Sequence, residues 1–340
     1  MSSEQAAYQS ASPFTTQYDH ICSGSYRHFV QIIRKQVFFN FAFFILFFIQ
    51  IITLLLGFTF LAKSSLLAFS LGLLFLTVFS YFVLRLYITA RIPEQLNLLL
   101  EKFIINCKGL INYQEHSMQA SLNLASAACQ FAAALRNRES TFYPLPFWLQ
   151  AFKPVIEKIS AWWHWEDVQQ MQELLLYSSI NEHLKLITTE PTNIHVHASL
   201  GSIYVMLATL YKESNQEPQQ AWQPPGKYSE SVEPKFQAAA NRAIEEFTIL
   251  QDLAPEDPFI HAQLASHYST LQMPHEEMKE HETVLRLNPS DVDTLYQLGV
   301  LYFQQGYNAK GLSIYEQLRR SYPKEASELI KLYGAYNPFH

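Results

Sequence analysis

The sequence predicts an all-α protein: a transmembrane helical hairpin, then a helical domain, then an α-solenoid of about three repeats with a capping helix. Three observations lead to this prediction. Two long apolar runs almost free of charge lie in the first 90 residues. The 340 residues include only 10 glycines, and the abundant Leu, Ala, Gln and Glu favour helix. Finally, Pro255, Pro289 and Pro323 recur every 34 residues, a period typical of stacked helix pairs.

Charge and cysteine content exclude several classes of function. The net charge of the chain is −6, and residues 91–340 carry 19 basic and 28 acidic side chains. A nucleic-acid-binding surface needs a basic patch, so we expect no nucleic-acid partner. The three cysteines, Cys22, Cys107 and Cys129, are too far apart for a disulfide framework or a metal knuckle.

The chain begins with a segment that we predict to be disordered, residues 1–35, because its first 26 residues are rich in Ser, Gln and Thr. The predicted transmembrane hairpin follows at residues 36–90. Its two apolar runs, Val37–Ala62 and Ser65–Ala90, each exceed the roughly 20 residues that cross a bilayer. Thirteen of the 25 phenylalanines lie between Val37 and Leu84. The hairpin therefore anchors the chain in a lipid bilayer.

Basic residues predict the orientation of the hairpin. Positive charges gather outside its open end and only Lys63 lies at its tip; the flanking residues are Arg27, Arg34, Lys35, Arg85 and Arg91. Because cytoplasmic flanks are enriched in Lys and Arg, we expect both termini to be cytoplasmic. We expect a two-span protein of a bacterial inner membrane.

Residues 91–165 are predicted to form a membrane-proximal helical region. Pro93 suits the first turn of a new helix, along which Leu96, Leu99, Leu100, Phe103, Cys107 and Leu110 share one face, with Gly109 as a possible break. A second helix over about 116–138 would bury Met118, Leu122, Ala125, Cys129 and Ala132. A linker at 139–147 precedes a third helix that ends in Trp162-Trp163-His164-Trp165. This aromatic cluster could pack at a corner between helices, lie among lipid headgroups or bind a partner.

Residues 166–340 contain the internal repeat. Leu264 and Leu298, like Tyr268 and Tyr302, are 34 residues apart, and predicted helices 258–272 with 275–287 and 292–305 with 309–321 form two pairs. Leu200-Gly201-Ser202-Ile203-Tyr204 begins an earlier unit, whose second helix is displaced by an inserted loop at 214–232. Glu166–Thr188 is a candidate second helix of a still earlier unit. Residues 324–333 would cap the last apolar face.

This pattern resembles the tetratricopeptide repeat (TPR) family. The last unit matches best, at Leu298-Gly299, Tyr302, Gly306, Tyr315 and Pro323, and departs at Gly311 and Leu318, where the family usually has Ala. The resemblance implies that the conserved small and aromatic positions are core. Gly201 and Gly299 would let paired helices approach closely.

The resemblance also implies a groove lined by the first helix of each unit, which would hold a partner peptide. Carried over residue by residue, the groove positions are His195, Ala198, Ser202, Val205 and Met206, then Phe259, Ala262, Ser266, Ser269 and Thr270, then Asp293, Tyr296, Val300, Phe303 and Gln304. The partner-binding residues that we select are Val205, Met206, Phe259, Tyr296, Val300 and Phe303. Since the groove lacks the basic residues that grip acidic C-termini in some family members, we expect an apolar or aromatic segment as its ligand.

The sequence shows no reaction chemistry. His195 and His197 lie two residues apart, which on a helix diverges them too far to share an ion, and neither a zincin motif nor a cysteine pair accompanies them. No phosphate loop or nucleophile elbow is present. We therefore expect no catalytic residue, no cofactor, no metal and no small-molecule substrate.

The leading hypothesis is a membrane-anchored protein–protein interaction scaffold that binds partners through the TPR groove. An alternative comes from the Ser-rich start followed by two close hydrophobic lobes, which resembles the layout of chlamydial inclusion-membrane proteins. That layout implies a secreted effector inserted into a host-derived membrane. An enzyme with an unrecognised site in residues 91–190 is a third reading.

Overall fold

The structure is a computed structural model that describes residues 13–61, 66–111, 117–143, 147–212, 222, 224–228 and 230–335. These residues form helices and no strand, which confirms the predicted all-α class for the described part of the chain. The chain divides into two compact units. The first comprises residues 1–182 with 221–227, and the second comprises 183–220 with 228–340.

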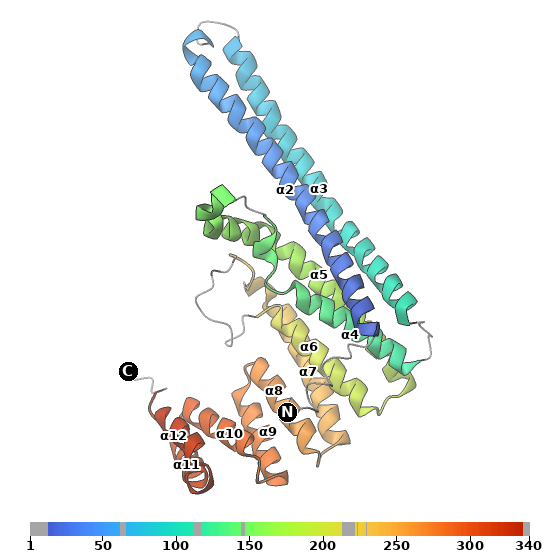
Figure 1. Ribbon diagram of the computed structural model, residues 1–340, viewed down its shortest axis with the longest axis vertical. Coiled ribbons are helices and arrows are strands. Elements are labelled where there is room, and N and C mark those ends of the chain that lie inside the picture. Colours follow the sequence, from blue (N-terminus) through green and yellow to red (C-terminus); the bar gives the residue numbers. More distant parts are fainter. Residues whose placement is uncertain are drawn as a thin grey trace. The chain divides into compact units, whose positions relative to one another are not determined.

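Two long antiparallel helices, α2 (Pro13–Leu61) and α3 (Leu66–Ile111), run side by side in the first unit (Figure 1). Both are long and apolar enough to span a membrane, with mean hydropathies of 2.5 and 2.2 in their most apolar stretches. Those stretches are only 0% and 6% buried within the protein. A helix of a water-soluble core would bury such a surface against the rest of the protein. The predicted tip, Lys63–Ser65, lies outside the described residues.

Polar side chains pair the two helices within their apolar parts. Gln50 Nε2 donates to Thr77 Oγ1 at 2.8 Å, and the Tyr81 hydroxyl donates to Asn40 Oδ1 at 3.2 Å. The ring of Phe39 stacks on that of Tyr81, with centroids 5.9 Å apart. Because an unpaired polar group is costly in an apolar surround, these contacts favour one register of the hairpin.

Three predictions about the ends of the hairpin are wrong. Residues 13–35 are helical, as the first part of α2, although we expected disorder up to residue 35. Pro93 lies inside α3 instead of starting a new helix, and α3 also continues through Gly109 to Ile111. A proline inside a helix costs about 3 kcal/mol. Burial of Ile92 and Leu96 on either side of Pro93 offsets this cost.

The N-terminal part of α2 and the C-terminal part of α3 pack on α4 (Met118–Leu135). The side chain of Ser117 caps the N-terminus of α4. Phe29 of α2 is fully buried, and Phe103 of α3 packs on Phe131 of α4 with ring centroids 5.0 Å apart. The predicted buried face of α3 is largely confirmed, at Leu96, Leu99, Phe103 and Cys107.

The buried face of α4 is wider than predicted. It includes Ala125 and Ala132, as expected, but it is centred on residues that were not singled out, Leu124, Ala128, Phe131 and Leu135. Met118, Leu122 and Cys129 are only half-buried at its margin. Small alanines allow neighbours on several sides, so the apolar spacing alone did not define one face.

Two short 3₁₀ helices, η1 (Glu139–Thr141) and η2 (Phe147–Phe152), lead into α5 (Lys153–Thr189). We expected a boundary between residues 165 and 166, but α5 runs through it, and the two units divide after Glu182. The sequence holds neither glycine nor proline between Pro154 and Pro191, so nothing interrupts this helix. Within the aromatic cluster, Trp162 is exposed while His164 is buried and lies 3.3 Å from the Tyr143 hydroxyl.

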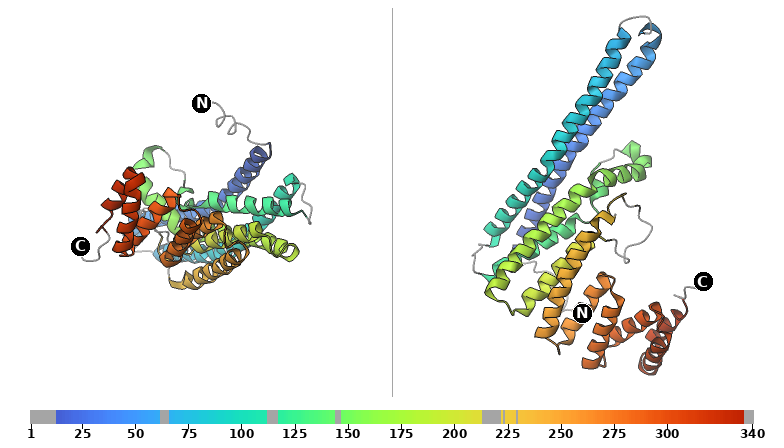
Figure 2. Two further views of the ribbon diagram at one scale, coloured as in Figure 1. Left: turned by 90° about the horizontal axis from the view of Figure 1, so that it is seen from below. Right: turned by 180° about the vertical axis from the view of Figure 1, so that it is seen from behind.

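The second unit is a succession of antiparallel helices, visible from yellow to red in Figure 2. Its helices after the end of α5 are α6 (Ile194–Thr209), η3 (Glu230–Val232), α7 (Glu233–Leu253), α8 (Pro258–Thr270), α9 (Pro274–Leu287), α10 (Val292–Gln304), α11 (Asn308–Ser321) and α12 (Pro323–Lys331). The helices pack in pairs, α6 on α7, α8 on α9 and α10 on α11, and α12 covers α10 and α11. These bounds agree with the predicted pairs to within two residues.

Glycines lie where paired helices meet. A Cβ added at Gly201 of α6 would lie 2.8 Å from the Phe247 ring of its partner α7. One at Gly299 of α10 would lie 3.0 Å from Ile314 of its partner α11 and 2.7 Å from Leu329 of the capping helix α12. Real Cβ atoms essentially never make contacts under 3.0 Å. The predicted reason for these two glycines, close helix packing, is confirmed.

The predicted inserted loop, 214–232, lies partly outside the described residues. Its described part contains a turn at 225–228 and the 3₁₀ helix η3. Lys227 Nζ lies 2.5 Å from Glu139 Oε1, a contact within the first unit. The insert is therefore more structured than a simple loop.

Candidate functional site: a groove between α8 and α10

The second unit contains a hollow of about 930 Å³ between α8 and α10. The first turns of α9 close one side of it. Seven of the predicted groove positions line it: Ala262, Ser266, Ser269, Thr270, Tyr296, Val300 and Gln304. Its size lies within the range of about 300–1,000 Å³ that is usual for ligand sites.

Equivalent residues set the ends of α8 and α10. Asp257 Oδ1 accepts a hydrogen bond from the Phe259 amide at 2.9 Å, and Asp291 Oδ1 accepts one from the Thr294 amide at 3.2 Å. Side-chain oxygens at this position satisfy amides that the helix leaves unpaired. Both helices are followed by a residue with positive φ, Gln272 at 60° and Gly306 at 77°. Caps and turns are each 34 residues apart, so the sequence period is also a period of local geometry.

Only two of the six selected binding residues line this groove, Tyr296 and Val300. Val205 is buried in the core of the second unit, and Met206 is half-buried beside it. Phe259 is 72% exposed on the first turn of α8, outside the hollow. These three residues do not form one surface with Tyr296.

The prediction that Phe303 lines the groove is wrong, because its side chain is only 3% exposed. Its ring lies over Gly311, where an added Cβ would be 2.5 Å from Phe303 Cε1. It also meets Tyr333 edge-to-face at 5.7 Å. Because Gly311 has no side chain, the ring has the space that it occupies. Phe303 therefore belongs to the core.

The remaining groove surface is polar and mostly uncharged. Gln297, Gln304 and Gln305 are exposed along α10 and its end, and Ser266 is exposed on α8. Amide and hydroxyl groups both donate and accept, so they suit the alternating N–H and C=O groups of an extended peptide.

Two titratable residues lie at the side of the groove. Burial raises the pKa of Glu277, against the effect of a hydrogen bond from Ser269, and burial lowers the pKa of His281. His281 Nδ1 is buried and has no hydrogen-bond partner among the described residues. His281 therefore packs at the wall of the groove as a buried side chain, and the neutral amides are the groups that face a ligand.

His197 was predicted only not to share a metal ion with His195, yet it has a structural role that is repeated at His261. His197 Nδ1 lies 2.6 Å from Glu246 Oε2, and its Nε2 lies 2.9 Å from the Pro191 carbonyl. His261 makes the same two contacts, with Glu280 at 2.6 Å and with the Pro255 carbonyl at 3.1 Å. Each histidine follows its proline by six residues, a spacing that was readable in the sequence. Among the described residues, no group of three or more His, Cys, Asp or Glu side chains could hold a metal ion.

No protein-family model matches the chain, and no curated protein matches it.

Proposed function

We propose that this protein is a membrane-anchored scaffold that binds partner proteins through a TPR-like groove in its second unit. The observation that carries the proposal is the open groove between α8 and α10, lined by seven of the positions that the TPR resemblance implies. The repeated Asp caps and left-handed turns support assignment of these helices to TPR units.

The hairpin supports the membrane anchor. The apolar stretches of α2 and α3 leave large side chains such as Phe38, Phe69 and Phe75 exposed. An exposed apolar surface of this extent needs a cover, and the lipid core of a bilayer is thick enough to cover the apolar stretches of both helices. The basic residues beside the open end favour cytoplasmic termini, in a bacterial inner membrane.

The chemistry of the groove favours, as its ligand, an extended peptide segment with one apolar or aromatic side chain. Tyr296 and Val300 form the apolar strip on which that side chain packs. The exposed glutamines of α10 and the hydroxyls of α8 hydrogen-bond to the peptide backbone. Because Phe303 is buried, the apolar strip is narrower than the sequence led us to expect, and hydrogen bonds to the peptide backbone supply more of the affinity.

The test begins with the full chain in lipid nanodiscs, against which a displayed library of random peptides is selected. A photoreactive residue at Gln304, in the groove, is compared with one at Lys279, which is exposed on α9 and does not line the groove. We expect selected peptides to crosslink at position 304 and not at 279.

The affinity of a selected peptide is then measured for Tyr296→Ala and for the matched variant Tyr322→Ala, which removes an exposed tyrosine outside the groove. We expect at least a tenfold loss for Tyr296→Ala, since loss of an aromatic anchor costs about 2 kcal/mol, and little change for Tyr322→Ala. Equal affinities for both variants, or peptides that bind elsewhere, would exclude the groove as the binding site.

A further inference from the structure

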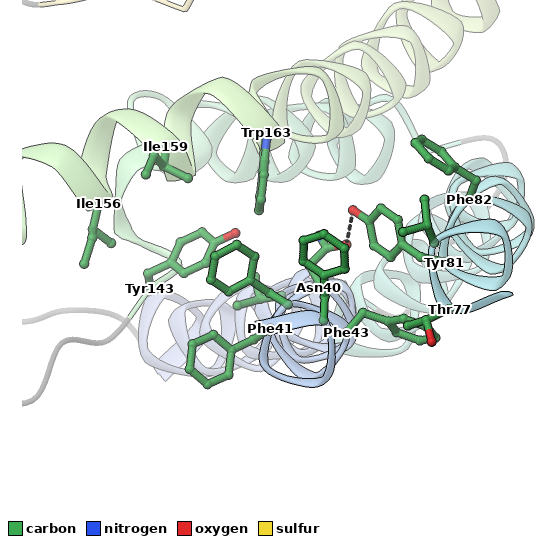
Figure 3. Close-up of a pocket in the computed structure, with 14 residues that line it drawn as sticks. Asn40, Phe41, Phe43, Thr77, Tyr81, Phe82, Tyr143, Ile156, Ile159 and Trp163 are labelled. Carbon is green, nitrogen blue, oxygen red and sulfur yellow. Dashed lines mark hydrogen bonds between the residues drawn. The ribbon is translucent and has the colours of Figure 1, made fainter. Parts of the chain in front are cut away.

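The first unit contains an apolar cleft of about 700 Å³ between the hairpin and α5. Figure 3 shows Ile156, Ile159 and Trp163 of α5 on one side of the cleft and side chains of α2 and α3 on the other. Its walls are almost entirely hydrocarbon and aromatic. Tyr143 also lines it, and burial raises the pKa of that phenol to about 12.

A small polar hollow of about 150 Å³ adjoins this cleft. Asn40 and Trp163 line both cavities, so the two are neighbours. The polar hollow is further lined by Gln36, Arg85, Glu166 and Asp167. An apolar cleft beside a polar pocket is the shape of a site for a molecule with a hydrocarbon chain and a charged head.

Arg85 supplies a positive charge, and its guanidinium has N–H donors beyond the one that bonds to Tyr81. One of its nitrogens, Nη1, donates to the Tyr81 hydroxyl at 2.9 Å, and the guanidinium lies 5.9 Å from the ring centroid of Trp163. Among the described residues, no carboxylate lies within ion-pair distance of it. A guanidinium has five N–H donors and binds phosphate well.

Two further features of the polar hollow indicate which chemical groups a ligand would present there. Gln36 lines the hollow, and its Nε2 is a buried donor without an acceptor among the described residues. Glu166 is exposed and lines the same hollow, and Asp167 lies beside it, paired with His164 at 3.3 Å. The hollow therefore offers both a cation for a phosphate and carboxylates for an ammonium group.

We propose that this cleft binds a single phospholipid of the phosphatidylethanolamine type. One acyl chain lies between the hairpin and α5, the phosphate contacts Arg85, and the ammonium group faces Glu166 and Asp167. A membrane lipid is the occupant that the site favours, because the cleft opens on helices whose apolar stretches are long enough to cross a bilayer. A peptide would leave its backbone unpaired in such a cleft.

This inference shares the membrane placement of the hairpin with the proposed function but does not depend on the α8–α10 groove. Loss of lipid binding with retained peptide binding would overturn only the lipid site, and the reverse result would overturn only the groove. The two tests can use the same purified full chain.

The experiment is native mass spectrometry of the full chain in detergent, titrated with phosphatidylethanolamine and, separately, phosphatidylglycerol. Val78→Phe fills the cleft, and Val83→Phe makes the same change on the same helix at a residue that does not line it. Ile159→Phe and Val155→Phe repeat this comparison on α5, in case one variant fails to fold. Arg85→Gln removes the proposed phosphate contact, and Arg91→Gln is its matched control outside both cavities.

We expect one tightly held phosphatidylethanolamine per chain. Val78→Phe, Ile159→Phe and Arg85→Gln should each weaken it about tenfold or more, whereas Val83→Phe, Val155→Phe and Arg91→Gln should not. Arg85→Lys should retain part of the affinity. Equal retention by cleft and control variants, equal or tighter binding of phosphatidylglycerol, or no retained lipid would each overturn the proposal.

Discussion

His197 and His261 occupy the same place in successive helix pairs and make the same two contacts, one to a glutamate on the second helix and one to the carbonyl of a proline six residues earlier. In His197, where both acceptors carry negative or partial negative charge, these hydrogen bonds favour a ring with protons on both nitrogens. The 34-residue unit thus repeats a buried polar contact as well as its apolar core. In the third pair, Leu295 and Ile314 replace the histidine and the glutamate, and the contact becomes apolar.

The first prediction concerns pH. Burial lowers the pKa of His197, but its hydrogen bonds to Glu246 and to the Pro191 carbonyl raise the pKa further, so the net direction is upward. A raised folded-state pKa stabilises the fold fully below the unfolded value, about 6.5, and this contribution is lost as pH rises through the folded-state pKa. We expect amide hydrogen exchange in α6 and α7 to speed up above pH 6.5 by more than the pH dependence of the intrinsic exchange rate explains. His197→Gln should remove this pH dependence, and an unchanged dependence in that variant would contradict the assignment.

His267 predicts the opposite dependence in the same unit. Its ring stacks on Phe247 at 5.3 Å, and burial lowers its pKa. A histidine buried in its neutral form stabilises the fold above about pH 6.5, and this contribution is lost as pH falls through the unfolded-state pKa. His267→Gln should therefore reduce the loss of stability that the second unit shows when the pH falls from 6.5 to 5. Amide hydrogen exchange in α8 measures this loss. His281, whose pKa burial also lowers, leaves part of the acid effect in place.

The third prediction tests the packing of Phe303 on Gly311. Gly311→Ala should destabilise the second unit by about 1–3 kcal/mol, because the new methyl overlaps the buried ring. Phe303→Leu shrinks the ring side chain and should make Gly311→Ala less harmful, so the double variant should be more stable than the sum of the single effects predicts. Denaturant unfolding of the four proteins measures this coupling. Strict additivity would show that the ring and the glycine do not share space.

A fourth prediction concerns the polar pair inside the hairpin. Thr77→Val removes the acceptor of Gln50 Nε2, whose Oε1 already lacks a partner, and leaves the whole amide unsatisfied. Gln50→Leu removes that amide, while Thr77 keeps its bond to the Leu73 carbonyl. We expect Thr77→Val to lower the melting temperature in detergent micelles more than Gln50→Leu, with a cost of about 1–2 kcal/mol. The reverse order would mean that water or lipid satisfies Gln50.

The fifth prediction concerns Lys227 and Glu139. Both side chains are at most 17% exposed, and the second carboxylate oxygen, Glu139 Oε2, has no hydrogen-bond partner among the described residues. Lys227→Met should cost about 3–5 kcal/mol, because it leaves a buried carboxylate unpaired. The double variant Lys227→Met/Glu139→Met should recover most of this loss. Lys153→Met, which breaks an exposed pair with Glu157, should change the melting temperature little. Equal effects of the two lysine variants would contradict a buried pair.

Much of the secondary structure was predictable because it follows from spacing along the chain. The apolar runs of residues 37–90 and the 34-residue period of Pro255, Pro289 and Pro323 predicted the hairpin and the last two helix pairs. The close packing at Gly201 and Gly299 was also predictable, since a side chain has no room where two helices touch.

Local signals misled where packing outweighs them. Pro93 looks like a helix start, yet burial of Ile92 and Leu96 carries α3 through it. The Trp162–Trp165 cluster was predicted to end a helix, yet α5 continues through it because no glycine or proline follows before Pro191.

The sequence alone determined that this protein is helical, that its first part contains two helices apolar enough for a membrane, and where the later helices pair. The tertiary structure alone decided which residues face the groove. Tyr296 and Phe303 are seven residues apart on one helix and share a face by spacing. Tyr296 lines the open groove, whereas Phe303 turns into the core because Gly311, on the next helix, leaves space for its ring. The spacing of a helix defines a face, but only the neighbour packed against that face decides how much of it remains exposed.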